Sequence, residues 1–332
     1  MAATINFQKY KFFKCIFSFL LLLMVLPIWI KYPNMKSFIT DWAYTDVKHR
    51  ERTFYICPLF MGRLGNTMFQ YATAYGISTE KDLRVIIPSV SLIAKTFIVD
   101  ADMPENATRV CSTFPVLYEP HNAWGIHIQS FSFGIYGNSS VCMRGYFQSY
   151  KYFNHAKNAI KQQFMSFKEE TRIKAATILQ EARRYYLANL NATNVTLIGV
   201  HVRRGDKLAG AETLLGQTIA PREYFVKAMD YFNSKYNNSV FIICGENQTW
   251  AKENIQPTYS VIFLNQSSTP DVDLAILAMC DHMIMSIGSY SWWAAYLNAG
   301  EVIYYKDWII PGSYVSKGFK HDDYFPPQWI PK

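Results

Sequence analysis

Residues 195–206 read VTLIGVHVRRGD, and they carry the clearest sign of the fold class. Its first part, residues 195–202, is largely apolar and β-prone, which is typical of a strand buried in a parallel sheet. A turn marked by Gly205 follows it. Helical patterns then alternate with further apolar runs, which lie at residues 239–244, 259–264, 282–286 and 301–305. Strands that alternate with helices form a parallel sheet, so we predict a doubly wound α/β unit here.

A similar pattern opens the earlier part of the chain. Residues 53–58 and 83–87 read as strands, and the helical pattern of residues 67–78 lies between them. The sequence therefore predicts an α/β protein of two Rossmann-like halves, residues 53–194 and residues 195–332, that face a cleft. In such folds ligands bind in the crevice beyond the carboxyl ends of the strands.

The N-terminus carries a candidate membrane anchor. Residues 16–30 read IFSFLLLLMVLPIWI without a charge, and with the two phenylalanines before it the run approaches the about 20 residues that cross a bilayer. More lysines precede the run than follow it, which predicts a cytosolic tail at residues 1–11 and a lumenal remainder. We expect an uncleaved transmembrane signal anchor over residues 12–30 and a stem over residues 31–52. A cleaved signal peptide is the alternative, but bulky and charged residues occupy the expected cleavage region.

Asn-x-Ser/Thr sequons support a lumenal location. Each alone is a weak signal, but all seven follow the anchor, which suits a chain exposed to glycosylation enzymes. The candidate glycosylation sites are Asn106, Asn138, Asn191, Asn194, Asn237, Asn247 and Asn265.

Charge and cysteine content exclude other classes. The chain of 332 residues has a net charge of +8, but five lysines within the first 36 residues leave only +3 for the rest. A nucleic-acid-binding protein would concentrate positive charge on its folded part, so we expect no nucleic-acid partner. Six cysteines are present, one of them in the membrane run, and none has the spacing of a zinc site. Disulfides are permitted, but their pairing stays open.

Two adjacent arginines are the strongest chemical signal. Arg203, Arg204 and Asp206 come directly after the strand of residues 195–202, at its carboxyl end. Guanidinium groups bind phosphate through paired donors and stabilise the negative charge that develops on a leaving diphosphate. The alternative is a buried Arg–Asp pair that only ties the two halves together.

Two further turns lie between a strand and a helix. Residues 62–66 read GRLGN and residues 286–289 read SIGS. Glycines allow a ligand to approach the backbone, and a helix N-terminus favours an anion. Neither turn matches a Walker loop or the dinucleotide fingerprint, and each alone could be a plain turn or a helix cap. Together with residues 201–206, they predict a site for a phosphate-bearing ligand in the cleft.

These motifs also carry a family resemblance. GRLGN followed by FQYA, then GVHVRRGD, then DLAILAMCDHMIMSIGSYSWWAAYLNAG resembles, in the same order, the galactoside α-1,2-fucosyltransferases of glycosyltransferase family 11. The resemblance runs from about Tyr55 to Tyr305 and is weakest at residues 89–150. It implies a GT-B-like fold with residues 53–194 on the acceptor side and residues 195–332 binding GDP-fucose.

The reaction that the resemblance implies is transfer of L-fucose from GDP-fucose to the 2-hydroxyl of a galactose-terminated glycan. It implies inversion at the anomeric carbon, no required metal or other cofactor, and a Golgi membrane protein of single-pass type II topology. Arg203, Arg204 and Asp206 would be catalytic, with the two arginines binding and stabilising the diphosphate. His201 and Asp206 would shape or bind the guanosine end, or support the residues that do. The further donor-binding residues would be Gly62, Arg63, Gly65, Asn66, Ser286, Gly288 and Ser289.

The sequence contains candidate residues for a metal site and for a general base. The Asp-x-Asp strings at Asp100–Asp102 and Asp271–Asp273 are the pattern that holds a metal in many glycosyltransferases, but the second suits the first turn of a helix. We expect no metal. No general base stands out; His121, His127 and Asp102 are candidates, and a dissociative path with weak base assistance is the alternative.

Other functions stay open at this point. An α-1,6- or protein O-fucosyltransferase would share the HxRRxD element, and a non-catalytic lumenal glycan-binding protein would also explain the anchor and the sequons. A neutral glycan does not need the two arginines that would bind a diphosphate, which argues against the glycan-binding protein. Aromatic residues of the middle segment could stack on an acceptor sugar, although core packing is the commoner role. They are Tyr118, Trp124, Phe131 and Phe133.

Overall fold

The computed structural model describes residues 54–120, 125–204, 214–255, 259–264 and 268–332. The expected tail, anchor and stem lie outside these ranges, as do Asp206 and Asn265. Within the described ranges, no helix is both long enough and apolar enough to span a bilayer. Residues Arg52–Lys332 form one compact unit.

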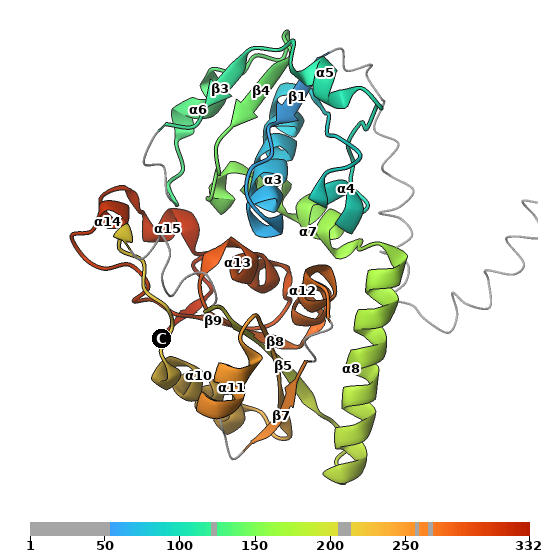
Figure 1. The fold of residues 1–332 in the computed structure, drawn as a ribbon, viewed down its shortest axis with the longest axis vertical. Helices are drawn as coiled ribbons and strands as arrows, with labels where there is room; N and C mark the ends of the chain where they lie inside the picture. The colour runs from blue at the N-terminus through green and yellow to red at the C-terminus, as the bar shows by residue number, and fades with distance from the viewer. Residues whose placement is uncertain (1–53, 121–124, 205–213, 256–258, 265–267) are drawn as a thin grey trace, which may run out of the picture. The chain divides into compact units, whose positions relative to one another are not determined.

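A four-stranded parallel sheet forms the first part of this unit (Figure 1). Its strand order is β2-β1-β4-β3, and the strands are β1 Tyr55–Pro58, β2 Arg84–Val85, β3 Val116–Tyr118 and β4 Val141–Arg144. Helix α3, Leu64–Lys81, follows β1 and buries most of its length against the sheet and the neighbouring helices. The shorter helices of this part are α4 Leu92–Thr96, α5 Ala107–Cys111, α6 Gln129–Phe133 and α7 Lys157–Met165.

A six-stranded parallel sheet forms the second part. Its order is β10-β9-β8-β5-β6-β7, with the motif-bearing strand β5, Thr196–Val202, inside the sheet. The other strands are β6 Ser239–Gly245, β7 Ser260–Phe263, β8 His282–Met285, β9 Val302–Tyr304 and β10 Ile330–Pro331. The helices are α10 Arg222–Lys235, α11 Gln248–Asn254, α12 Pro270–Met279, α13 Gly288–Leu297, α14 Tyr314–Gly318 and α15 His321–Tyr324. The predicted α/β class with parallel sheets is confirmed.

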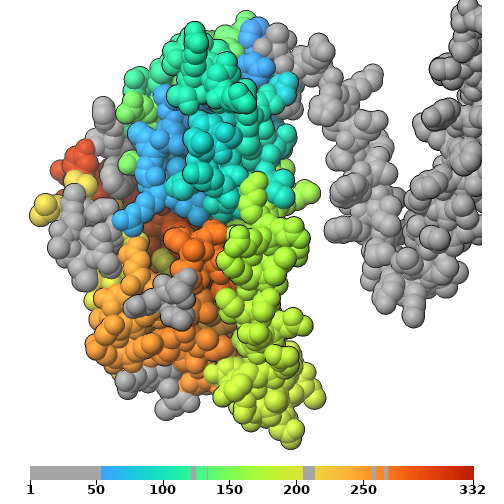
Figure 2. Space-filling model, turned by 45° about the vertical axis from the view of Figure 1, so that its right-hand side comes forward, coloured from blue at the N-terminus to red at the C-terminus, as the bar shows by residue number. Residues whose placement is uncertain are grey.

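Helix α13 packs directly against α3 and joins the two sheets through an aromatic core. Phe69 of α3 lies with its ring centroid 4.5 Å from that of Trp292 and 5.1 Å from that of Trp293, and all three are fully buried. Helix α8, Glu169–Asn189, packs against α12 and runs along the face of the molecule seen in Figure 2. The carboxyl ends of strands from both sheets are thereby held near one another.

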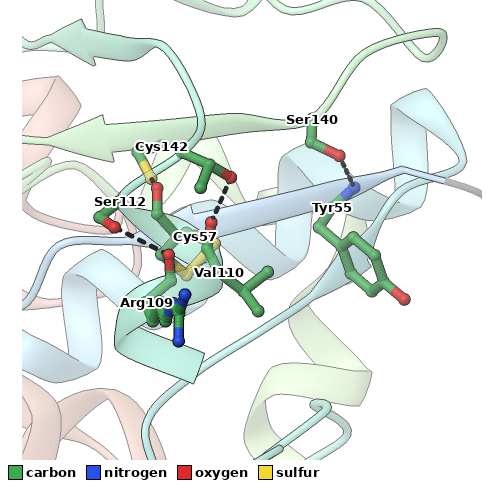
Figure 3. The surroundings of a disulfide bond; sticks show 9 residues. Tyr55, Cys57, Arg109, Val110, Ser112, Ser140 and Cys142 are labelled. Atoms are coloured by element: carbon green, nitrogen blue, oxygen red, sulfur yellow. Dashed lines mark hydrogen bonds between the residues drawn. A yellow bond between two sulfur atoms is a disulfide. The ribbon is translucent and has the colours of Figure 1, made fainter. Parts of the chain in front are cut away.

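A disulfide connects β1 to α5. Cys57 and Cys111 are bonded, and Cys142 of β4 lies beside them with a free thiol that donates to the carbonyl oxygen of Cys111 at 3.1 Å (Figure 3). Burial raises the pKa of the Cys142 thiol to about 11, so it stays protonated. Cys244 and Cys280 are buried thiols.

Candidate active site

A cavity of about 930 Å³ opens where the carboxyl ends of the strands meet. Its wall comes from both sheets, as expected for a parallel α/β fold. The lining segments follow β1, β4, β5, β6 and β8, and they include residues 62–66, 146, 148, 203, 245–246 and 287–290. Its size suits a ligand as large as a nucleotide sugar.

Arg203 lines this cavity at the end of β5. Its backbone N–H donates to Ser286 Oγ at 3.0 Å, which fixes the turn. Its guanidinium forms an ion pair with Glu246, and the same carboxylate oxygen lies 3.2 Å from Arg63 Nη1. A carboxylate between two guanidinium groups marks a position in the cavity where an anion is stable.

Arg204 has different surroundings. Its guanidinium stacks on Trp250, with Cζ 3.7 Å from the ring centroid, and Nη1 donates to the carbonyl oxygen of Ala220 at 3.3 Å. Burial lowers the pKa of Arg204. It is not among the residues that line the cavity, and Asp206 lies outside the described part of the chain. The structure thus places Arg203, but not Arg204, at the cavity.

His201 lies in β5 and contributes to the cavity wall while only 5% exposed. Burial and the charge of Arg203 lower the pKa of His201 to about 3, so its ring is neutral at physiological pH. Its Nδ1 lies 3.4 Å from Ser286 Oγ. Ser286 is itself buried behind the wall, where it holds the backbone of Arg203.

Asn66 connects the two glycine turns. Its Oδ1 accepts hydrogen bonds from Ser289 Oγ at 2.6 Å and from Gln148 Nε2 at 3.0 Å. Gly62 and Gly288 line the cavity with φ of +80° and +86°, a backbone conformation that favours glycine. Gly65 also lines it, and a Cβ there would lie 2.4 Å from the backbone nitrogen of Tyr290. The close approach of α3 to α13 is therefore one reason for this glycine.

Three acidic residues in the cavity wall are not among the donor-binding or catalytic residues predicted from the sequence. Glu246 follows β6 directly, and its position at a strand end is a signal that could have identified it. Asp271 accepts a hydrogen bond from Thr171, and hydrogen bonds keep its pKa low against the opposing effect of burial. Burial raises the pKa of Asp273, and Asp273 Oδ1 has no partner among the described residues. Gln248 Oε1, also in the wall, is likewise buried and without a partner there.

The other predicted residues that the structure describes do not line the cavity. Asp102 forms an ion pair with Arg84, and the backbone N–H of His127 donates to Asp323 at 2.9 Å. His121 and Trp124 lie outside the described residues. Tyr118 is exposed without lining the cavity, and Phe131 is buried in the core.

The sequons differ in exposure. Asn247 caps α11, with Oδ1 accepting from the backbone N–H of Trp250 at 2.9 Å, and is half-buried. Asn265 lies outside the described ranges. The exposed asparagines are Asn106, Asn138, Asn191, Asn194 and Asn237.

Comparison with known proteins places the chain in a family. The model described as Glycosyl transferase family 11 matches residues 31–331. Galactoside alpha-(1,2)-fucosyltransferase 1 of Saimiri sciureus is 30% identical over 272 residues, which cover 81% of this chain and 72% of that protein. Galactoside alpha-(1,2)-fucosyltransferase 2 of Bos taurus is 31% identical over 276 residues, covering 81% and 76%. Among solved structures, the fucosyltransferase NodZ from Bradyrhizobium aligns with a TM-score of 0.47 and 13% identity, over 73% of this chain and 92% of that one.

Proposed function

The chain belongs to glycosyl transferase family 11, and from this premise we propose that it transfers L-fucose from GDP-fucose to the 2-hydroxyl of a galactose residue on a glycan. The names of its curated relatives support the reaction and the linkage. The observation that carries the proposal is the position of Arg203, the first arginine of the HxRRxD element, in the wall of the large cavity.

The diphosphate takes the position that the Glu246 carboxylate holds between Arg63 and Arg203. These guanidinium groups form ion pairs with one carboxylate oxygen, so they are arranged around an anion before any ligand arrives. A diphosphate oxygen offers the same charge and more acceptors. Glu246 is displaced toward solvent, where 42% of its side chain is already exposed.

The guanine ring faces Asp273 and Gln248. Both residues line the cavity wall, and each has a buried oxygen, Asp273 Oδ1 and Gln248 Oε1, without a partner among the described residues. A buried acceptor needs a donor, which these side chains can gain by turning toward a bound ligand. The N–H groups of guanine are such donors, whereas the corresponding edge of adenine carries an acceptor at N1. We therefore expect GDP to bind more tightly than ADP.

The reaction is an in-line displacement with inversion. The acceptor hydroxyl oxygen bonds to the anomeric carbon of fucose, the bond from that carbon to the diphosphate oxygen breaks, and GDP leaves with the electron pair. The hydroxyl proton is released to water as the new bond forms. Arg203 and Arg63 stabilise the charge that develops on the diphosphate. They supply positive charge that a divalent ion would otherwise provide, so we expect transfer to need no metal.

The chain's organisation follows from the same proposal. Residues 53–194 form the acceptor side and residues 195–332 the GDP-fucose side of a GT-B-like architecture. Residues 12–30 anchor the protein in the Golgi membrane, with the catalytic part in the lumen and the candidate sequons accessible to glycosylation there.

A transfer assay with linkage analysis tests the proposal. The detergent-solubilised full chain is incubated with GDP-fucose and methyl β-galactoside, with and without EDTA, beside Arg203→Ala and the exposed control Arg172→Ala. We expect EDTA-resistant product linked at the 2-hydroxyl, a loss of at least about a hundredfold in Arg203→Ala, and normal activity in the control. Product at another hydroxyl would contradict the linkage, and absence of both GDP-fucose binding and transfer would reject the proposal.

A further inference from the structure

The cavity wall has an apolar, exposed region on the side of the first sheet. Of the exposed large apolar side chains in the described part of the chain, Leu92 and Tyr146 line the cavity, at 44% and 39% exposure. Both come from segments of the first sheet's half. Of the aromatic residues that the second sheet's half contributes, Trp308 and Tyr324 are 7% and 3% exposed, and Tyr290 is half-buried. A ligand can therefore cover Tyr146 but can hardly reach Trp308 or Tyr324.

Tyr146 is held by the residues around it. The Glu119 carboxylate, just after β3, accepts the backbone N–H of Tyr146 at 2.7 Å and that of Phe147 at 2.9 Å through one oxygen. Phe147 adopts φ of +51° and is fully buried, with its ring 4.8 Å from that of Phe131. A phenylalanine rarely adopts this conformation, and here a carboxylate and an aromatic core hold it there.

The same turn reaches the other half of the cavity. Gln148 lines the wall two residues after Tyr146 and donates through Nε2 to Asn66 Oδ1 at 3.0 Å. Asn66 also accepts from Ser289 at the start of α13. The turn of residues 145–148 is thus fixed at both ends, and it sets an exposed aromatic ring beside a polar amide.

We propose that Tyr146 is the stacking platform for the acceptor galactoside and that Glu119 is the positioning residue that holds it. The inference rests on the proposed function and names the acceptor subsite. A galactose ring has one face of C–H groups, which packs on an aromatic ring, and hydroxyls at its edge, which need polar partners. Tyr146 offers the ring, and Gln148 offers the amide on the same turn.

Binding and kinetics of Tyr146 variants test the platform. Full-length wild type, Tyr146→Ala, Tyr146→Phe and the control Tyr136→Ala, an exposed tyrosine outside the cavity wall, are compared. We expect Tyr146→Ala to raise the KM for methyl β-galactoside about tenfold, with the GDP-fucose KM within about twofold, because only the acceptor loses its stacking surface. Tyr146→Phe and Tyr136→Ala should stay close to wild type. An unchanged acceptor KM in Tyr146→Ala would overturn the platform.

Variants of Glu119 test the positioning role. Glu119→Gln keeps an oxygen that can accept both backbone N–H groups, whereas Glu119→Met removes it at similar size. We expect Glu119→Met to raise the acceptor KM severalfold without changing GDP-fucose binding, and Glu119→Gln to restore it. Equal changes in donor and acceptor binding would indicate a general folding defect and would refute the positioning role.

Direct binding separates the inference from the proposed function. Saturation-transfer NMR of methyl β-galactoside, with GDP present, needs no turnover. Loss of the galactoside signal in Tyr146→Ala, but not in Tyr136→Ala, supports the platform even if wild type transfers no fucose. A signal unchanged in Tyr146→Ala would contradict the platform even if wild type is an active fucosyltransferase.

Discussion

Arg203 and Arg204 are chain neighbours with guanidinium groups in different surroundings. Arg203 reaches the cavity, and Arg204 stacks on Trp250 and binds the carbonyl oxygen of Ala220, before α10. The prediction that both bind the diphosphate stays a prediction, since the segment that follows them lies outside the described residues. The contacts of Arg204 by themselves indicate that it supports the turn that carries Arg203.

Arg204→Lys tests this supporting role. A lysine lacks the planar group that stacks on an indole, so we expect a loss of about 1–2 kcal/mol in the free energy of unfolding. The GDP-fucose affinity should fall far less than in Arg203→Ala. Chemical denaturation and calorimetric titration measure the two effects, with Arg172→Lys as an exposed control. A loss of affinity as large as that of Arg203→Ala would show direct phosphate binding instead.

Asp273 represents a conflict between stability and binding. Burial raises its pKa, and Asp273 Oδ1 has no hydrogen-bond partner among the described residues, so the charged form destabilises the empty protein. We expect Asp273→Asn to keep or raise the melting temperature while weakening GDP binding about tenfold or more, since an amide places a donor where guanine needs an acceptor. Thermal shift and titration calorimetry measure both. Unchanged affinity for GDP would remove Asp273 from the guanine subsite.

The buried Glu119 is expected to make the free energy of unfolding depend on pH. Burial raises the pKa of Glu119 from 4.5 to about 7, so the folded state retains a proton that the unfolded state releases. The resulting stabilisation is complete below pH 4.5 and is lost as the pH rises through 7. Relative to Glu119→Gln, wild type should therefore lose about 3 kcal/mol between these pH values. Urea unfolding at several pH values checks this, and parallel curves for the two proteins would contradict it.

At the scale of elements, the crossing of α3 and α13 depends on Gly65. A Cβ at this position would lie 2.4 Å from the backbone nitrogen of Tyr290, and backbone cannot move aside as a flexible side chain can. The two helices carry residues of both glycine turns, so their approach also sets the width of the cavity there.

Gly65→Ala is therefore expected to destabilise the protein by about 2 kcal/mol or more and to weaken GDP-fucose binding at the same time. Gly134→Ala is the matched control, because a Cβ there meets nothing closer than 3.7 Å. Denaturation midpoints and donor titrations provide the comparison. A Gly65→Ala protein as stable as the control would show that the helices can separate without cost.

At the scale of the whole molecule, both sheets contribute to one cavity within a single compact unit. A ligand that contacts Arg63 from one half and Arg203 from the other stabilises their shared folded state. Binding to the folded state alone stabilises it by about 2.7 kcal/mol at a concentration of one hundred times Kd.

GDP-fucose at one hundred times its Kd should raise the melting temperature of the described unit. The unit should still unfold in a single transition. Differential scanning calorimetry of the full chain measures it, with GDP-mannose as a nucleotide control and Arg203→Ala as the protein control. We expect the shift to disappear in Arg203→Ala at the same ligand concentration. Two separate transitions, of which the ligand shifts only one, would show that the halves bind independently.

Much of the fold and part of the site could be predicted from local sequence. The alternation of apolar runs and helical patterns indicates parallel sheets, because each strand and helix carries its own period and end signals. The position of residues 201–203 at a strand end follows from the same reasoning. The motifs at residues 62–66, 199–206 and 286–289 occur in the same order in a known family, and this match indicates the reaction. All three motifs lie at or just after the ends of strands.

The side chains of those turns that face the cavity could not be predicted from local sequence, because their directions depend on the folded molecule. Arg203 and Arg204 cannot be told apart by position, and Asp273 resembles any acid in the first turn of a helix. The Cys57–Cys111 pairing and the support of Tyr146 by Glu119 join residues that lie 54 and 27 positions apart. Local sequence determines strands, helices and turns because those depend on near neighbours. The direction, partners and burial of a side chain depend on distant segments that meet only when the chain folds.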